Sequence, residues 1–147
     1  MIEDLAEEED INGIIQLLTP LEQSGMVVKR NREQLLLDIE NFYVIRREQQ
    51  VIACAALFTS KDNKTAELAC LAVSPTYQHS GRAGKLFQFI CAQANNKQLQ
   101  SIYVLTTQTS HWFKERGFIK SEAQKLPEEK QRLINQDRTS EGYLYQL

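Results

Sequence analysis

Two uninterrupted apolar runs constrain the fold of this 147-residue chain more than any other feature. Residues 51–58 (VIACAALF) lack the polar alternation of a strand with one solvated face, so they should form a strand buried on both faces. Residues 67–73 (ELACLAV) form another apolar strand, closed by Ser74 and Pro75. Residues 42–45 (FYVI) form a third strand signal. Polar turns at 46–50 and 61–64 connect the three runs, and such short connections predict an antiparallel meander.

Helical periodicity flanks these strands. It covers residues 10–21, where Pro20 is expected to end or kink the helix and Gly25 to follow as a stop signal. Residues 31–34 (NREQ) resemble a capping box that opens a second helix, and a long helix occupies 81–96. The apolar residues expected on the buried faces are Ile11, Ile14, Ile15, Leu18, Leu21, Leu35, Leu36, Ile39, Leu86, Phe87, Ile90, Cys91 and Ala94.

The remaining elements are shorter. They are a weak strand at 2–6, a strand at 102–105, a helix at 110–116 that stops at Gly117, strands at 118–119 and 143–145, and a helix at 126–136. We therefore predict an α+β (mixed α/β) architecture, in which a central twisted mixed sheet of six or seven strands is flanked by helices. Residues 1–147 are expected to form one domain.

Composition excludes several classes of protein. The net charge is −2, so there is no broad basic surface for nucleic acid, and no apolar run approaches the length of a membrane helix. The acidic N-terminus differs from a signal peptide, which predicts a cytoplasmic protein. Three cysteines without a C-x-x-C pair (Cys54, Cys70 and Cys91) fit small buried residues better than disulfides or zinc ligands.

The segment 73–86 (VSPTYQHSGRAGKL) carries the clearest chemistry. A buried strand ends at a proline, and a glycine-containing loop opens a helix whose N–H groups and dipole attract anions. Arg82 and Lys85 add positive charge. From the residues alone, the segment is either a pyrophosphate cradle or an ordinary loop before a helix, since it matches neither the P-loop nor the Rossmann pattern.

Two motifs supply a resemblance to a known family. Residues 78–84 (QHSGRAG) resemble the Q/R-x-x-G-x-G/A acetyl-CoA signature of GNAT-family N-acetyltransferases, and residues 113–118 (FKERGF) resemble the Y-x-x-x-G-F motif of that family. Within the family, the chain is most similar to the acetyltransferase domain of N-acetylglutamate synthases. The stretches that carry this likeness are residues 20–25, 28–35, 52–57, 104–107 and 111–118.

The resemblance implies a GNAT fold and acetyl-CoA as cosubstrate. The backbone of Leu71, Ala72 and Val73 would pair with the pantetheine arm. The pyrophosphate would lie on the amides of Gln78, His79, Ser80, Gly81, Arg82, Ala83 and Gly84. In the family, the strands on either side of the long helix splay apart and leave a slot for the thioester.

Acetyl transfer to an amine requires that a proton leave the amine. Glu67 lies in an apolar strand, and partial burial would raise its pKa toward neutrality, as a general base needs. The alternative is a solvated glutamate near a turn; the resemblance favours the base, since GNAT bases commonly lie on this strand. Phe113 replaces the tyrosine that serves many GNAT enzymes as general acid, so Thr106, Thr107 or Ser110 are candidates to donate hydrogen bonds to the leaving thiolate.

A glutamate acceptor would need cations and N–H donors for two carboxylates. The resemblance assigns substrate contacts to Val28, Arg30, Cys70, Lys130, Arg138 and Ser140, where Cys70 packs beside the site or offers its backbone. Lys29, Arg32 and Arg132 are interpreted as solvated, and Trp112 as a packing residue. The sequence places no other candidate metal ligands with His79 or His111, so no metal is expected.

The resemblance implies transfer of acetyl from acetyl-CoA to the α-amine of L-glutamate in a ternary complex, the first step of arginine biosynthesis. The alternatives are a GNAT enzyme for another small amine or a protein N-terminus, and a non-catalytic acyl-CoA-binding module. The chain is too short to include the amino-acid-kinase-like domain common in this family. The sequence is compatible with a homo-oligomer or with a covalent partner domain in a longer protein, whereas nucleic-acid and membrane partners are not expected.

Overall fold

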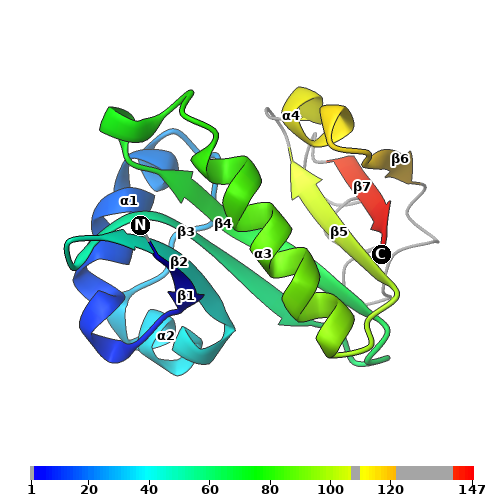
Figure 1. Cartoon of the computed structure of the whole chain (residues 1–147), viewed down its shortest axis with the longest axis horizontal. Helices are drawn as coiled ribbons and strands as arrows, with labels where there is room; N and C mark the ends of the chain where they lie inside the picture. Colours follow the sequence, from blue (N-terminus) through cyan, green and yellow to red (C-terminus); the bar gives the residue numbers. More distant parts are fainter. Residues whose placement is uncertain (1, 107–109, 122–140) are drawn as a thin grey trace. The chain divides into compact units, whose positions relative to one another are not determined.

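The computed structural model describes residues 2–106, 110–121 and 141–147. Within these residues seven strands form one sheet in the order β1-β2-β3-β4-β5-β7-β6, which confirms the predicted strand number (Figure 1). The strands are β1 (Ile2–Leu5), β2 (Phe42–Arg47), β3 (Gln50–Thr59), β4 (Thr65–Val73), β5 (Ser101–Thr106), β6 (Ile119–Ser121) and β7 (Glu141–Gln146). The α-helices are α1 (Ile11–Gln23), α2 (Arg32–Leu37), α3 (Arg82–Asn96) and α4 (Ser110–Glu115). Single 3₁₀ turns are η1 (Glu8–Asp10), η2 (Ile39–Asn41) and η3 (Pro75–Tyr77).

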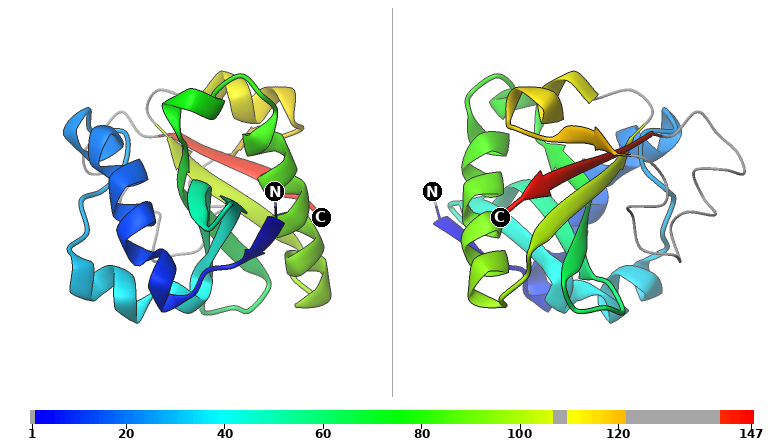
Figure 2. Two further views of the ribbon diagram at one scale, coloured as in Figure 1. Left: turned by 60° about the vertical axis from the view of Figure 1, so that its left-hand side comes forward. Right: turned by 90° about the vertical axis from the view of Figure 1, so that its right-hand side faces the viewer.

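The first of two compact units comprises Met1–Leu57 and Ala69–Gln93. In it β2 pairs antiparallel with both β1 and β3, and residues 51–57 of β3 are buried, as the apolar run predicts. Helices α1 and α2 lie on one face of these strands and α3 on the other (Figure 2). The Tyr43 ring meets the Phe89 ring of α3 edge to face, with centroids 5.9 Å apart. Both faces of the central strands are thereby covered.

Helix α1 extends past Pro20 to Gln23, so of the two expected effects, an end or a kink, the proline does not produce the end. A proline removes only its own N–H donor, and here its ring is exposed near the helix end. The Ser24 N–H donates to the Pro20 carbonyl at 3.1 Å, so the last turn stays bonded. The helix then stops before Gly25, whose φ of +79° suits the predicted stop.

Helix α2 begins as its sequence predicts. Asn31 accepts a hydrogen bond from the Gln34 N–H at 2.8 Å, and the Gln34 side chain accepts one from the Asn31 N–H at 2.9 Å. This reciprocal pair is the predicted capping box. Leu35 is fully buried, whereas Leu36 is half-buried, so the buried face of this short helix is narrower than expected.

The β2–β3 connection is a two-residue turn and is tighter than the five-residue polar turn expected from the sequence. Arg47 pairs with Gln50, which leaves Glu48 and Gln49 as the central residues. Both have positive φ, 51° and 70°, as in the hairpin turns whose twist matches that of the strands. These side chains rarely adopt that conformation, so sequence patterns do not suggest so short a turn.

Strand β1 forms one edge of the sheet. It has four residues, and its Ile2 and Leu5 side chains are exposed. Asp4 on the same strand contacts the guanidinium of Arg46, with Nη1 and Oδ2 3.0 Å apart.

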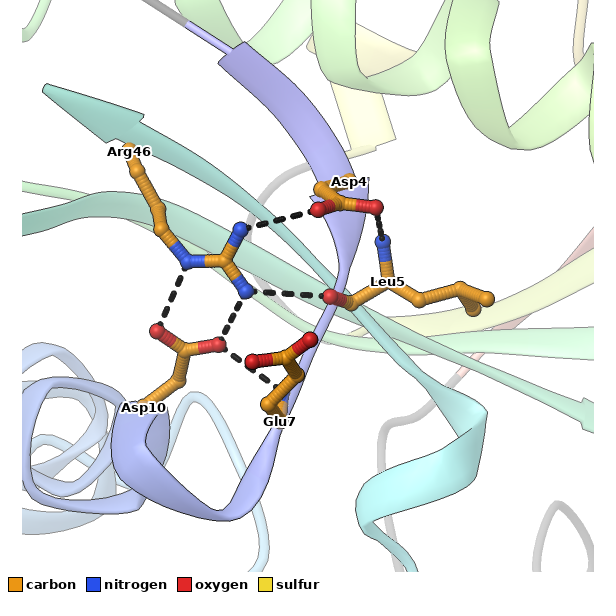
Figure 3. Close-up of polar contacts among 5 residues, drawn as sticks. All are labelled: Asp4, Leu5, Glu7, Asp10 and Arg46. Carbon is orange, nitrogen blue, oxygen red and sulfur yellow. Dashed lines mark hydrogen bonds and ion pairs between the residues drawn. The ribbon is translucent and has the colours of Figure 1, made fainter. Parts of the chain in front are cut away.

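Arg46 also joins β2 to the start of α1 (Figure 3). Its Nε donates to Asp10 Oδ1 at 2.9 Å, and its Nη2 donates to Asp10 Oδ2. Burial by itself would raise the pKa of the Asp10 carboxyl, but hydrogen bonds from Arg46 and from the Glu7 N–H outweigh it and hold that pKa below its ordinary value. The hydrogen bond to Asp10 in turn raises the pKa of Arg46.

The second unit comprises Phe58–Leu68 and Ala94–Leu147. Here β5 runs parallel to β4 from the pair Thr65–Ser101 to the pair Glu67–Tyr103, and antiparallel to β7. Three rings connect α4 to the strands: Phe113 meets Phe118 at 5.2 Å between centroids, and Phe118 meets Tyr145 at 5.2 Å. The helix predicted at 126–136 lies outside the described residues.

Candidate functional site

The loop between β4 and α3 has the backbone of an anion-binding loop. The Ser74 N–H donates to the Ile52 carbonyl at 2.8 Å, which anchors the start of the loop on β3. Gly81 has a φ of +82°, and a Cβ placed there would meet nothing within 4 Å. The first helical bond of α3 runs from the Lys85 N–H to the Gly81 carbonyl at 3.1 Å. The N–H groups of residues 82–84 therefore precede the helical ladder and point from the helix N-terminus.

Arg82 gives this loop an unsatisfied donor. Its Nε is buried and has no hydrogen-bond partner among the residues that the structure describes. A buried donor without a partner costs free energy, and an anionic ligand oxygen would relieve that cost. Lys85 and His79 are exposed nearby in the chain. The open space at Gly81, the helix N-terminus and the Arg82 donor all fit a pyrophosphate.

Arg47 and Tyr77 form a contact beside this loop that the sequence did not suggest. The Arg47 Nη1 lies 3.0 Å from the Tyr77 hydroxyl, and the guanidinium lies 5.8 Å from the centroid of the same ring. Tyr77 belongs to η3, immediately before the predicted pyrophosphate residues. The two residues are 30 positions apart, so neither periodicity nor a local motif could have paired them.

Strand β4 carries the cysteine assigned to substrate binding. Cys70 is 7% exposed and has a φ of +57°, a left-handed conformation in the middle of a strand. Its Sγ accepts a hydrogen bond from Arg30 Nη1 at 3.4 Å, and its carbonyl accepts one from the Cys54 thiol at 3.5 Å. Burial raises the pKa of the Cys54 thiol, which fits the prediction of a small buried residue.

In the segment between α1 and α2, some side chains are exposed and others form hydrogen bonds. Val28 is 74% exposed, and Lys29 is exposed as predicted. Arg32 is also exposed and donates to the Asn12 side chain. Arg30 differs, because it is half-buried and reaches Cys70. Among Lys29, Arg30 and Arg32, only Arg30 is half-buried, and its role in substrate binding stays a prediction.

The structure describes only some of the other predicted site residues. Glu67 is half-buried in β4 and pairs in register with Tyr103 of β5. Thr106 is the last residue of β5. Four of the predicted residues, Thr107, Lys130, Arg138 and Ser140, lie outside the described residues, as does Arg132. Trp112 has the Arg116 guanidinium 3.8 Å from its ring centroid and meets Phe113 edge to face, consistent with a packing role.

The part of the chain that the structure describes contains no group of three or more His, Cys, Asp or Glu side chains arranged to hold a metal ion. None of its helices is long and apolar enough to cross a membrane.

Comparison with known proteins decides the family. Residues 38–120 match the acetyltransferase (GNAT) domain family. The chain belongs to the GNAT acetyltransferases. This confirms the resemblance found in the loop motif, and the GNAT match includes β2 to β5, α3 and α4.

Curated relatives of this GNAT chain narrow the comparison. Amino-acid acetyltransferases of Pseudomonas putida are 46% identical over 132 residues, which is 90% of this chain and 31% of the relative. The enzyme of Ectopseudomonas mendocina is 46% identical over 135 residues, 92% of this chain and 31% of the relative. The chain therefore spans about a third of the length of these relatives.

Solved structures agree with the sequence comparison. N-acetylglutamate synthase from Neisseria gonorrhoeae, complexed with coenzyme A and N-acetyl-glutamate, superposes with a TM-score of 0.95 at 33% identity over 99% of this chain and 35% of that chain. The same synthase complexed with coenzyme A and L-arginine gives a TM-score of 0.88 at 31% identity, covering 99% of this chain and 33% of that chain.

Proposed function

We propose that this chain transfers the acetyl group of acetyl-CoA to the α-amine of L-glutamate. The observation that carries the proposal is the TM-score of 0.95 with a synthase complexed with coenzyme A and N-acetyl-glutamate. The relatives named amino-acid acetyltransferases support the same class of acceptor. The reaction would be the first step of arginine biosynthesis, as the family resemblance implies.

Coenzyme A would lie along the end of β4 and the loop before α3. The pantetheine arm would pair with the backbone of Leu71 to Val73, as in the family. The pyrophosphate would accept hydrogen bonds from the loop amides and from the unsatisfied Nε of Arg82. Gly81 supports this arrangement because its open, left-handed position leaves the backbone accessible to a ligand.

The chemistry needs one base and one proton donor. Glu67 would accept the amine proton, directly or through a water, so that the free amine attacks the thioester carbonyl. A C–N bond forms and the C–S bond breaks, and the departing thiolate of CoA takes a proton. Thr106, Thr107 or Ser110 would stabilise that thiolate by hydrogen bonding, because Phe113 stands where the family often has a tyrosine.

Glutamate would be bound by its two carboxylates. Arg30 and Arg138 would each offer a planar fork of N–H donors, with Ser140, Lys130 and the Val28 segment completing the acceptor site. The half-buried position of Arg30 supports this role, since a partly desolvated guanidinium binds a carboxylate more strongly than an exposed one.

The test is release of free thiol from acetyl-CoA by the purified chain, measured with a panel of acceptors. L-glutamate should have the highest kcat/KM, and L-glutamine is the matched control of equal shape without the side-chain charge. Preference for spermidine or for a peptide N-terminus would move the chain to another GNAT acceptor class. Calorimetric binding of CoA without thiol release for any acceptor would favour an acyl-CoA-binding module.

Variants of the carboxylate-binding residues sharpen this test. Arg138→Ala should raise the glutamate KM by roughly ten- to a hundred-fold, the loss of a charge-assisted hydrogen bond, with little change in the acetyl-CoA KM. Arg138→Lys should recover only part, because a point charge lacks the planar fork. Lys29→Ala is the control and should have a near-normal glutamate KM, because that side chain is exposed.

A further inference from the structure

The β2–β3 hairpin contacts the loop between β4 and α3 at two points. The Ile52 carbonyl of β3 accepts a hydrogen bond from the Ser74 N–H at 2.8 Å, and the Arg47 Nη1 at the end of β2 donates to the Tyr77 hydroxyl at 3.0 Å. We propose that Arg47 is a positioning residue, which holds Tyr77 and thereby the loop that binds the pyrophosphate of CoA. The inference rests on the proposed function, because it assumes that residues 78–84 bind the pyrophosphate.

Arg47 comes from a backbone position with little freedom. It pairs with Gln50, and the two residues between them, Glu48 and Gln49, have φ values of 51° and 70°. Residues with a Cβ adopt such positive φ at a cost and keep it only where the surrounding structure fixes it, often near functional sites. The short turn therefore presents the Arg47 side chain from the end of a paired strand.

A register shift in the same hairpin accompanies the second contact. The pairing of β2 with β3 shifts between Ile45 and Arg46, and the pairs on either side of the shift leave Ile52 without a partner on β2. An extra residue of this kind bends a strand, and such irregularities are common next to binding sites. Ile52 is also the residue whose carbonyl anchors Ser74, so the irregular part of the hairpin is the part that supports the loop.

Tyr77 is the loop residue through which Arg47 would act on the backbone. The Tyr77 N–H donates to the Ser74 carbonyl at 2.8 Å, and the Tyr77 carbonyl accepts a hydrogen bond from the Ser80 hydroxyl. Tyr77 thus links the anchored start of the loop to the residue before Gly81. If Arg47 holds the ring, the amides of residues 78–84 are arranged before CoA arrives, and less conformational freedom is lost on binding.

Two contacts of one guanidinium with one side chain favour positioning over direct binding of CoA. Besides the hydrogen bond, the Arg47 guanidinium lies 5.8 Å from the centroid of the Tyr77 ring, and a cation over an aromatic ring adds attraction even at exposed sites. The alternative is that Arg47, which is exposed, binds a phosphate of CoA itself. Such a contact would depend on the Arg47 charge and not on the Tyr77 hydroxyl, so the two explanations predict different results for Tyr77→Phe.

The experiment measures the Kd for CoA by calorimetry, and the KM for acetyl-CoA and for glutamate, in variants of the full chain. Arg47→Met and Tyr77→Phe should each weaken CoA binding by about three- to tenfold, the scale of one hydrogen bond, and raise the acetyl-CoA KM by a similar factor. The glutamate KM and kcat should change by less than about twofold. Arg47→Lys, which keeps a donor and a positive charge, should fall between wild type and Arg47→Met.

The matched control is Lys61→Met, which removes an exposed positive charge from the turn after β3 and should bind CoA as wild type does. Thermal melts check that each variant is folded. Tyr77→Phe removes a single hydroxyl group, so it alone decides the matter if Arg47→Met does not fold.

The double variant of Arg47→Met with Tyr77→Phe tests whether the two side chains act through one contact. If they do, it should bind CoA no more weakly than Arg47→Met alone. Additive losses would overturn the proposal, as would an unchanged CoA affinity in either single variant or an equal rise in the glutamate KM. A wild-type chain that neither binds CoA nor releases thiol with glutamate would instead refute the proposed function itself, so the two failures are distinguishable.

Discussion

Gly81→Glu is the sharpest perturbation of the predicted pyrophosphate loop. Gly81 has a φ of +82°, and its added Cβ would meet no atom within 4 Å, so the folded state has room for the new side chain. The cost to folding is the left-handed backbone alone, roughly 1–2 kcal/mol for a residue with a Cβ. For a chain of this size each kcal/mol lowers Tm by about 2–4 °C, so the variant should remain folded at room temperature.

The effect of this variant on coenzyme A affinity comes from charge repulsion. A carboxylate about 5 Å from a phosphate repels it by about 3 kcal/mol at an effective dielectric constant of 20. Salt screens this repulsion at an exposed loop, which leaves about 1–3 kcal/mol. The affinity for CoA should therefore fall by roughly tenfold to a hundredfold, before any steric exclusion by the side chain is counted.

Calorimetric titration measures the affinity for CoA, and a thermal melt on the same samples measures the stability of the fold. Gly25→Glu is the matched control, because Gly25 has a φ of +79° and equally open surroundings at the end of α1. The two variants should lose similar stability, and only Gly81→Glu should lose CoA affinity. A folded Gly81→Glu chain that binds CoA as tightly as wild type would refute the assignment of this loop.

Three further predictions concern the proposed base, the acid limit of stability and helix packing. Glu67→Gln should lower kcat by ~10²–10⁴-fold, with the deficit shrinking at high pH where the amine loses its proton unaided; wild-type kcat across the pH range would contradict the base role. The pKa of Asp10 lies below its ordinary 3.8 when folded, so its stabilisation is present above pH 3.8 and is lost as pH falls through the folded pKa. Asp10→Asn should reduce the fall of Tm at acid pH in thermal melts. Arg46→Met should destabilise the fold more than Asp10→Asn at neutral pH, because it leaves the buried Asp10 carboxylate without its cation. Gly13→Ala should lower stability by roughly 1–3 kcal/mol in a denaturant melt although alanine favours helices, because its Cβ would lie 2.9 Å from Val51 Cβ; a stabilising Gly13→Ala would contradict the packing.

Local chemistry allowed the sequence to predict much of the fold. The capping box at Asn31 and Gln34 is encoded within four residues, and the buried run 51–57 needs no distant information. The glycine stops at Gly25 and Gly117 depend on φ values of +79° and +102° that glycine adopts easily, so these helix ends were also predictable.

Features that depend on distant or unusual backbone were not predictable. Glu48 and Gln49 adopt positive φ without the glycine or asparagine that normally signals it. The Arg30–Cys70 and Arg47–Tyr77 contacts span 40 and 30 residues, so no periodic pattern indicates them. Of the candidate site, the loop before α3 could be recognised from the sequence as a candidate anion-binding loop because one continuous segment carries it, whereas the acceptor residues were assigned only by family resemblance.

The edge strand β1 has a consequence for solubility. Among the described residues, no strand lies beyond β1 in the sheet order, and Ile2 and Leu5 add exposed apolar surface at 62% and 47%. Such an edge invites pairing with the same strand of another molecule, and proteins commonly prevent this with charge. Glu3 lies on that strand and, unlike Asp4, is not in the ion pair with Arg46, so two copies brought edge to edge would juxtapose their Glu3 charges. A charge-neutralising substitution of Glu3 would remove the repulsion and should therefore promote self-association through this edge.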